Sequence, residues 1–293
     1  MKNLRITDVR AVPGDSAFLI DDGETAILYD SGFAFTGDRV ADKIKAILGH
    51  RNPDYIFLTH SHYDHALGAV YVRRRWPSAK IVAGEYAARI FEKPSARAVM
   101  RELDQKFAHR CGVEKYEDRI DELSVDIPVK NGEVIRAGRM EFTAIHLPGH
   151  TKCSMAYYCA EEKLLLGCET LGVFNGKDEV VPSYLVGYQM TVDSIEKAEK
   201  LDVDRILVPH LGLISKEQAA FYLKRAKESA VATAAELVAV LKSGRSRAEA
   251  VAYFREKFYH GYIKEIYPVD AMELNTGITV DLLAREFKLN VIP

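Results

Sequence analysis

The densest group of candidate metal ligands in this 293-residue chain lies within six consecutive positions. It consists of three of the nine histidines and one aspartate: His60, His62, Asp64 and His65. Imidazole nitrogens and carboxylate oxygens are the ligands that Zn²⁺ and Fe²⁺ accept best near neutral pH, because they cost little to deprotonate. Buried together without a cation, three imidazoles would strongly resist protonation. The segment therefore predicts a metal site rather than a histidine-rich surface loop.

Three further candidate ligands lie just beyond apolar runs that predict β-strands: His150, Glu169 and His210. His150 stands in a tight Pro-Gly-His-Thr turn, and each of the three follows a separate predicted strand. Open α/β sheets place functional side chains at the carboxyl ends of their strands. We therefore expect these three residues to converge with the histidine run. For His146, which ends its own strand, we expect a core or supporting role.

The elements that position these residues alternate between strands and helices through most of the chain. The predicted strands are 17–20, 25–30, 53–59, 80–83, 134–135, 140–146, 154–159, 163–166 and 205–210. The predicted helices are 38–49 and 66–75, a helical and charged segment at 85–123, and helices from 215 onward, with a strand-plus-helix pattern at 279–287. This alternation predicts the α/β class.

Two parts are predicted from the same pattern. Residues 1–214 are expected to form one α/β domain with a helical insertion around 85–123, and residues 215–293 a helical C-terminal extension packed on it. Ser215 and Ser246 each precede a Gln or Glu by three positions, which is the capping-box signal for a helix start.

The composition narrows the classes of partner. Forty Lys and Arg against 42 Asp and Glu leave a net charge of −2, without the basic excess typical of nucleic-acid binding. No apolar run approaches the roughly 20 residues of a membrane span, and residues 1–8 lack the apolar core of a signal peptide. The four cysteines show no Cys-x-x-Cys pair, which favours a reducing cytoplasm. We expect a cytoplasmic protein with a small-molecule substrate and no nucleic-acid or membrane partner, and leave a homo-oligomer open.

Over roughly residues 15–215 these motifs resemble those of the metallo-β-lactamase superfamily. The residues that carry the resemblance are Asp30 at a strand end, the His-x-His-x-Asp-His run, His150 before a threonine, a carboxylate near 169, and His210. The resemblance implies an αββα sandwich, in which two packed sheets carry helices on their outer faces.

The resemblance also implies two metal ions, Zn²⁺ first, with iron or manganese as alternatives. One ion would be bound by His60, His62 and His150. The other would be bound by Asp64, His65 and His210. Asp30 would orient the ligands.

One position departs from the family pattern, which places an aspartate that bridges both metals directly after a glycine. Here Gly167 is followed by Cys168 and then by Glu169. Either Glu169 reaches the metals with its longer side chain, or Cys168 takes the position, or the bridge is missing. We favour Glu169, while a thiolate would favour a softer metal and make the site sensitive to oxidation.

The resulting prediction is a dinuclear metallo-hydrolase that cleaves an ester, a thioester or a lactone with a metal-activated water. Asp64 is the candidate catalytic residue, which would orient the water and accept its proton. Tyr184 and Tyr188 are candidates for binding the substrate oxyanion, or else they pack under the following helix. An iron-dependent redox enzyme similar to the persulfide dioxygenases and a non-catalytic metal-binding module remain as alternatives.

The C-terminal helices are similar in position to those of glyoxalase II-type thioesterases, which bind their thiol carrier there. The tail shows no clear basic clamp, so glutathione itself is not supported. Its aromatic residues, together with those of 85–123, could form the roof of an apolar pocket, or they are ordinary core residues.

Overall fold

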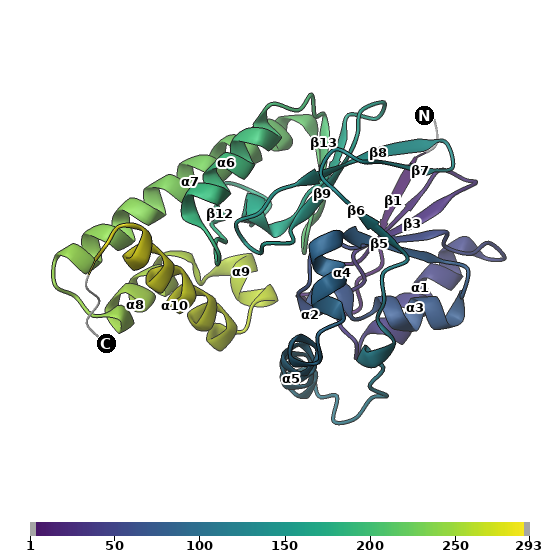
Figure 1. Cartoon of the computed structure of the whole chain (residues 1–293), viewed down its shortest axis with the longest axis horizontal. Coiled ribbons are helices and arrows are strands. Elements are labelled where there is room, and N and C mark those ends of the chain that lie inside the picture. The colour runs from purple at the N-terminus through teal and green to yellow at the C-terminus, as the bar shows by residue number, and fades with distance from the viewer. Residues whose placement is uncertain (1–3, 290–293) are drawn as a thin grey trace. The chain divides into compact units, whose positions relative to one another are not determined.

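The computed structural model describes residues 4–289, which contacts divide into two compact units. The N-terminal unit comprises the described residues up to His146 together with Cys153–Gly167, and the C-terminal unit comprises Leu147–Lys152 and the described residues from Cys168 onward. Figure 1 labels many of the elements of both units. Strands and helices are mixed throughout, and the predicted α/β class is confirmed. Within residues 4–289, no helix is both long enough and apolar enough to span a membrane.

The first sheet of the N-terminal unit has its six strands side by side in chain order. They are β1 (Arg5–Asp8), β2 (Phe18–Asp21), β3 (Ala26–Tyr29), β4 (Tyr55–Phe57), β5 (Lys80–Gly84) and β6 (Ile127–Val129). Pairing is antiparallel from β1 to β3 and parallel from β3 to β6. Every residue of β3 is buried, which explains why its sequence is continuously apolar rather than alternating.

Four more strands of this unit pair antiparallel in chain order and face the first sheet. They are β7 (Val134–Ala137), β8 (Met140–His146), β9 (Met155–Cys159) and β10 (Leu164–Leu166). Phe57 of β4 has its ring centroid 5.4 Å from that of Phe142 and 4.8 Å from that of Tyr157. These aromatic contacts form the buried layer between two packed sheets.

Two helices cover the other face of the first sheet. Helices α1 (Gly37–Leu48) and α3 (Ala69–Arg75) lie side by side, as Figure 1 shows. Val40 and Val70 belong to the same buried core as Leu28 of β3. The sheet is therefore apolar on both faces, which is what the sequence pattern of its central strands requires.

The segment predicted to be helical over 85–123 contains helices α4 (Glu85–Phe91) and α5 (Pro94–Arg110) and the short 3-10 helix η1 (Ile120–Glu122). Helix α5 packs on the loop after β3, where the Phe107 ring stacks on Phe33 with centroids 4.4 Å apart. This contact explains why the loop after β3 is buried although it has no regular structure.

The C-terminal unit combines short strand pairs with helices. Its elements are η2 (Glu169–Leu171), β11 (Val173–Phe174), β12 (Val180–Val181), α6 (Tyr188–Glu199), β13 (Arg205–Val208), β14 (Gly212–Ile214), α7 (Lys216–Lys242), α8 (Arg247–Phe258), α9 (Gly261–Ile266) and α10 (Val269–Glu286). Both predicted capping boxes are present, at Ser215 and at Ser246. Because α6 packs on α7, this unit begins earlier in the chain than the helical extension predicted from residue 215.

Two sequence-based expectations were wrong in detail. The strand predicted at the start of 279–287 lies inside α10, because packing of α10 on α8 outweighs the weak strand preference of its β-branched residues. The helix predicted over 66–75 is split into α2 (Tyr63–Ala66) and α3, with Gly68 between them.

Candidate functional site

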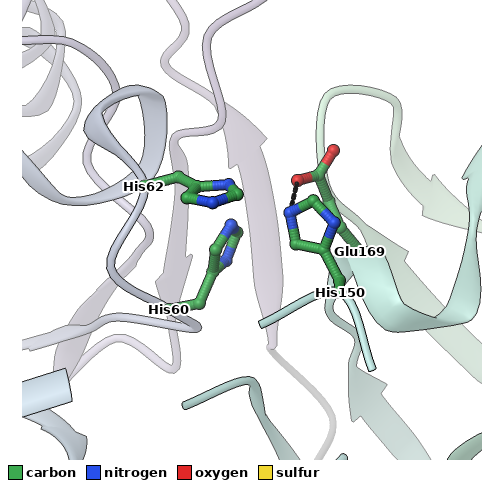
Figure 2. Close-up of side chains that lie close together, drawn as sticks. All are labelled: His60, His62, His150 and Glu169. Carbon is green, nitrogen blue, oxygen red and sulfur yellow. Dashed lines mark ion pairs between the residues drawn. The ribbon is translucent and has the colours of Figure 1, made fainter. Parts of the chain in front are cut away.

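The histidine run follows β4 and continues into α2, within the N-terminal unit. His60 and His65 are fully buried, whereas His62 and Asp64 are partly exposed. The His60 ring centroid is 4.6 Å from that of His62 and 4.1 Å from that of His65. Figure 2 shows the rings of His60 and His62 next to each other. The predicted run thus gathers its imidazoles into one cluster.

Asp30, just after β3, places a buried carboxylate against this cluster. Its Oδ2 lies 2.7 Å from Nδ1 of His65 and 2.9 Å from the Ser16 hydroxyl, and its Oδ1 accepts the Thr59 backbone N–H at 2.9 Å. Because an ionised carboxylate only accepts hydrogen bonds, Nδ1 of His65 carries the proton and Nε2 is the nitrogen able to bind a metal. The Thr59 hydroxyl lies 2.9 Å from Nδ1 of His60, which leaves Nε2 of that ring as the metal-binding nitrogen as well.

The backbone beside Asp30 explains the break between α2 and α3. Asp30 and Gly32 have φ values of 48° and 73°, in the left-handed region. A Cβ at Gly68 would lie 1.9 Å from the Ser31 carbonyl oxygen, so only glycine allows α3 to begin this close to the loop. The Ser31 N–H donates to the His65 carbonyl at 2.7 Å, which ties α2 to the end of β3.

The second cluster lies within the C-terminal unit and centres on Glu169, which is 3% exposed. Its Oε2 lies 2.8 Å from Nε2 of His150, the ion pair drawn in Figure 2, and its Oε1 lies 3.4 Å from Nε2 of His210. The Ser183 hydroxyl lies 2.7 Å from Nδ1 of His150. Each oxygen of one carboxylate therefore faces a different histidine.

Two tyrosines, one inside α9 and one directly after its last residue, donate hydrogen bonds to this second cluster. The Tyr267 hydroxyl donates a hydrogen bond to Oε1 of Glu169, and the Tyr262 hydroxyl donates to the backbone carbonyl of His210. His210 has a φ of 63°, so a bond to its carbonyl supports a backbone conformation that is unfavourable for a side chain. Neither tyrosine was predicted from the sequence, because nothing local distinguishes these residues from core aromatic residues.

Glu169, which directly follows Cys168, contacts both histidines of its unit. Cys168 is fully buried and lies near Tyr222. Burial raises the pKa of the Tyr222 phenol, and the nearby Cys168 and Glu169 raise it further. The Tyr222 hydroxyl donates to the Gly172 carbonyl at 2.8 Å. Of the alternatives for the altered motif, the geometry of this unit favours Glu169.

Tyr184 and Tyr188 pack against helices. Tyr184 is fully buried, its ring centroid lies 5.6 Å from that of Tyr188, and burial raises the pKa of its hydroxyl well above 10. The Tyr188 backbone N–H donates to Glu286 of α10 at 3.0 Å. This environment matches the packing alternative, and oxyanion binding by either phenol stays a prediction.

The donor atoms fit a divalent metal. Pairs whose ligand atoms lie within 4.8 Å of one another are His60 with His62, Asp64 with His65, and His150 with Glu169. Buried imidazoles whose Nδ1 atoms are held by hydroxyls or a carboxylate are typical of metal ligands, since this arrangement fixes the ring and presents Nε2. The combination of imidazole with carboxylate suits Zn²⁺, Fe²⁺ and Mn²⁺ without choosing among them.

Comparison with known sequences identifies relatives of this chain. A family model described as the metallo-beta-lactamase superfamily matches residues 12–210. A stretch of 146 residues is 27% identical to glyoxylase B2 of Dictyostelium discoideum and covers 49% of this chain and 45% of that protein. A stretch of 181 residues is 26% identical to a hydroxyacylglutathione hydrolase of Francisella tularensis subsp. holarctica and covers 61% of this chain and 58% of that protein. The chain thus spans about half the length of the curated relatives it matches.

Comparison with solved structures extends the likeness to nearly the whole chain. A metallo-beta-lactamase family protein from Thermus thermophilus has a TM-score of 0.64 at 18% identity and covers 98% of this chain and 95% of its own. An archaeal metallo-beta-lactamase superfamily protein from Sulfolobus tokodaii has a TM-score of 0.60 at 17% identity and covers 97% and 98%. The predicted fold, with its helical C-terminal region, is confirmed.

Proposed function

Because the chain belongs to the metallo-β-lactamase superfamily, we propose that it is a dinuclear metal-dependent hydrolase of a small-molecule thioester, with esters and lactones as related substrates. The observation that carries the proposal is the buried contact of Glu169 with both His150 and His210. Glutamate stands close to where the family pattern has a bridging aspartate. One oxygen facing each histidine is the arrangement that a carboxylate shared by two metal ions requires.

The proposed ligands follow the family pattern. His60, His62 and His150 are proposed for the first ion. Asp64, His65 and His210 are proposed for the second, with Glu169 between the two. When bound, the metals would polarise the substrate carbonyl and lower the pKa of a coordinated water to about 7.

The residues of this chain would then orient the reactants and move the proton. Asp64 lies in the first turn of α2, with its side chain 15% exposed and its Oδ2 3.6 Å from Nε2 of His65. A carboxylate that is partly accessible to solvent can accept the proton of the attacking water and return it to the leaving group. Asp30 holds the ring of His65, and Tyr267 holds the carboxylate of Glu169.

The thioester class is supported by the matched relatives. A hydroxyacylglutathione is a thioester, and a hydrolase of that name is 26% identical to 61% of this chain. Identity at this level supports the type of bond cleaved. It does not extend to the acyl group or to the thiol.

The test combines elemental analysis with a thioester assay that detects the released thiol. We expect two metal ions per chain in the wild-type protein, one or fewer in Glu169→Ala, and about a hundredfold lower kcat in Asp64→Asn. His50→Ala is the matched control, since His50 is exposed and follows α1. It should retain both the metal content and the turnover.

Two results would contradict the proposal. One iron per chain, with oxygen consumption in the presence of a persulfide and no thioester cleavage, would favour the redox alternative. Two bound metals without turnover of any thioester, ester or lactone would favour a non-catalytic metal-binding module.

A further inference from the structure

The C-terminal unit contains a pocket that the proposed metal ligands do not explain. Its cavity has a volume of about 40 Å³, opens to solvent, and is lined by residues of β11, β12, the segment after β12, α8, α9 and α10. Whole small-molecule sites typically enclose roughly 300–1,000 Å³. A cavity of this smaller size therefore suits one small group of a substrate, with the rest of the molecule outside it.

The lining of the pocket is apolar with a few neutral polar groups. Its apolar residues include Val181, Leu185, Phe254, Ile263 and Met272. Its polar residues are Ser183, Tyr267, Asn275, Thr276 and Thr279. Among the described residues that line the pocket, none carries a formal charge. Because an ionised group buried without a partner is strongly disfavoured, this lining selects against a charged ligand.

Two lining residues also contact the cluster around Glu169. Ser183 lies 2.7 Å from Nδ1 of His150, and Tyr267 donates its hydroxyl to Glu169. Both contacts are internal to the C-terminal unit. A group that occupies the pocket therefore lies next to side chains that hold two of the proposed metal ligands.

We infer that this pocket receives an uncharged, mainly apolar substituent of the substrate, bound directly beside the bond that is cleaved. The inference rests on the proposed function and narrows its substrate class. A glutathione conjugate carries carboxylates and an ammonium group, for which the lining offers no partner. The expected substrate is instead a thioester or ester with an alkyl or aryl group on one side of the carbonyl.

The experiment uses neutral N-acetylcysteamine thioesters with acyl chains from acetyl to decanoyl, with S-lactoylglutathione as the charged comparison. We expect kcat/KM to rise by up to about fourfold for each methylene that enters the pocket, until the pocket is full. S-lactoylglutathione should react more slowly than the best neutral thioester. A second series of acetyl thioesters with lengthened alkyl thiols would show the rise instead if the pocket holds the leaving group.

Neighbouring residues of α10 supply a variant and its control. Asn275 lines the pocket, whereas Leu274 is 56% exposed. Asn275→Trp should lower the ratio of octanoyl to acetyl kcat/KM at least tenfold, and Leu274→Trp should leave that ratio unchanged. Leu185→Trp fills the pocket from the segment after β12 and replaces Asn275→Trp if circular dichroism shows that the latter does not fold.

Binding of neutral octanamide, measured by calorimetry, gives a readout independent of turnover. We expect binding to the wild-type protein and to Leu274→Trp, and loss of binding in Asn275→Trp. The inferred role of the pocket would be refuted if thioesters were cleaved with no dependence of kcat/KM on chain length in either series, and if both variants bound octanamide equally. That result would leave the proposed function unaffected. Octanamide binding without turnover of any thioester, ester or lactone would refute the proposed function and leave the pocket standing.

Discussion

Replacing Asp30 by asparagine tests whether the metal-binding nitrogen of His65 is set by a neighbouring carboxylate. Asp30 is fully buried and accepts hydrogen bonds from Ser16, from the Thr59 backbone N–H and from Nδ1 of His65. Asparagine has nearly the same size but only one acceptor oxygen, and its amide nitrogen only donates. Whichever way the amide is turned, at least one buried donor faces another donor.

The magnitude follows from which bonds are lost. If the amide nitrogen replaces Oδ2, the Ser16 hydroxyl and Nδ1 of His65 lose their acceptor. Each buried donor left unsatisfied costs about 1–3 kcal/mol, so the two donors together should lower the free energy of unfolding by about 2–6 kcal/mol. The proton of His65 is no longer held on Nδ1, and loss of such an orienting contact lowers metal affinity by about 10–100-fold.

Denaturant unfolding measures the stability, and competition with a chromophoric chelator measures the metal affinity. Ser16→Ala is the control, because it removes one neutral bond to the same carboxylate, worth about 1 kcal/mol, and leaves the Asp30–His65 contact in place. It should lower stability slightly and keep the metal affinity within about threefold of wild type. If Asp30→Asn lost stability but bound metal as tightly as Ser16→Ala, Asp30 would serve only the fold.

Cys168→Ser should retain the wild-type metal content in elemental analysis and the wild-type affinity in chelator competition, because Glu169 is the residue that contacts His150 and His210. Loss of one metal ion in this variant would instead indicate that the Cys168 thiolate is a ligand. Tyr267→Phe removes the hydrogen-bond donor to Glu169 and should weaken metal binding about tenfold. Tyr86→Phe is the control, because Tyr86 is exposed. Equal metal affinity in the two variants would mean that Tyr267 does not support the metal ligand Glu169. Burial raises the pKa of Asp104 to about 7, whereas the pKa of an unfolded aspartate is about 3.9. The stability that Asp104 contributes is therefore present below about pH 4 and is lost as pH rises through 7. The loss amounts to up to about 4 kcal/mol. Asp104→Asn should flatten this part of the dependence in urea unfolding between pH 4 and pH 8, and an unchanged slope would mean that other groups produce it.

Much of the fold was predictable because its signals are local. A capping box lies within four residues, so Ser215 and Ser246 identified two helix starts from sequence. Burial on both faces makes a strand continuously apolar, which identified β3 without any knowledge of its partners. The strand expected near residue 279 failed for the opposite reason. The preference of β-branched residues for strands is weak, and the contacts of α10 with α8 decide the conformation there.

In the candidate site, too, the residues with local signals were predictable and those with long-range contacts were not. Residue types and spacing identified the run from His60 to His65 as metal-binding, because ligands supplied by one short turn lie close together in space wherever the turn is placed. The tyrosines around the second cluster could not be found in this way. Tyr267 is 98 residues from Glu169 and Tyr262 is 52 residues from His210, and no local pattern encodes contacts over such separations.

The sequence by itself thus determined that the chain carries metal-ligand chemistry at the ends of strands in an α/β fold. Tertiary structure decided three matters that depend on direction rather than on composition. Asp30 turns Nε2 of His65 toward its cluster, and Gly68 lets α3 approach the loop at Ser31. The side chain of Glu169, one residue after Cys168, contacts two histidines. The physical reason is that a hydrogen bond or a metal contact requires a defined angle as well as a residue type, and only the folded backbone sets that angle.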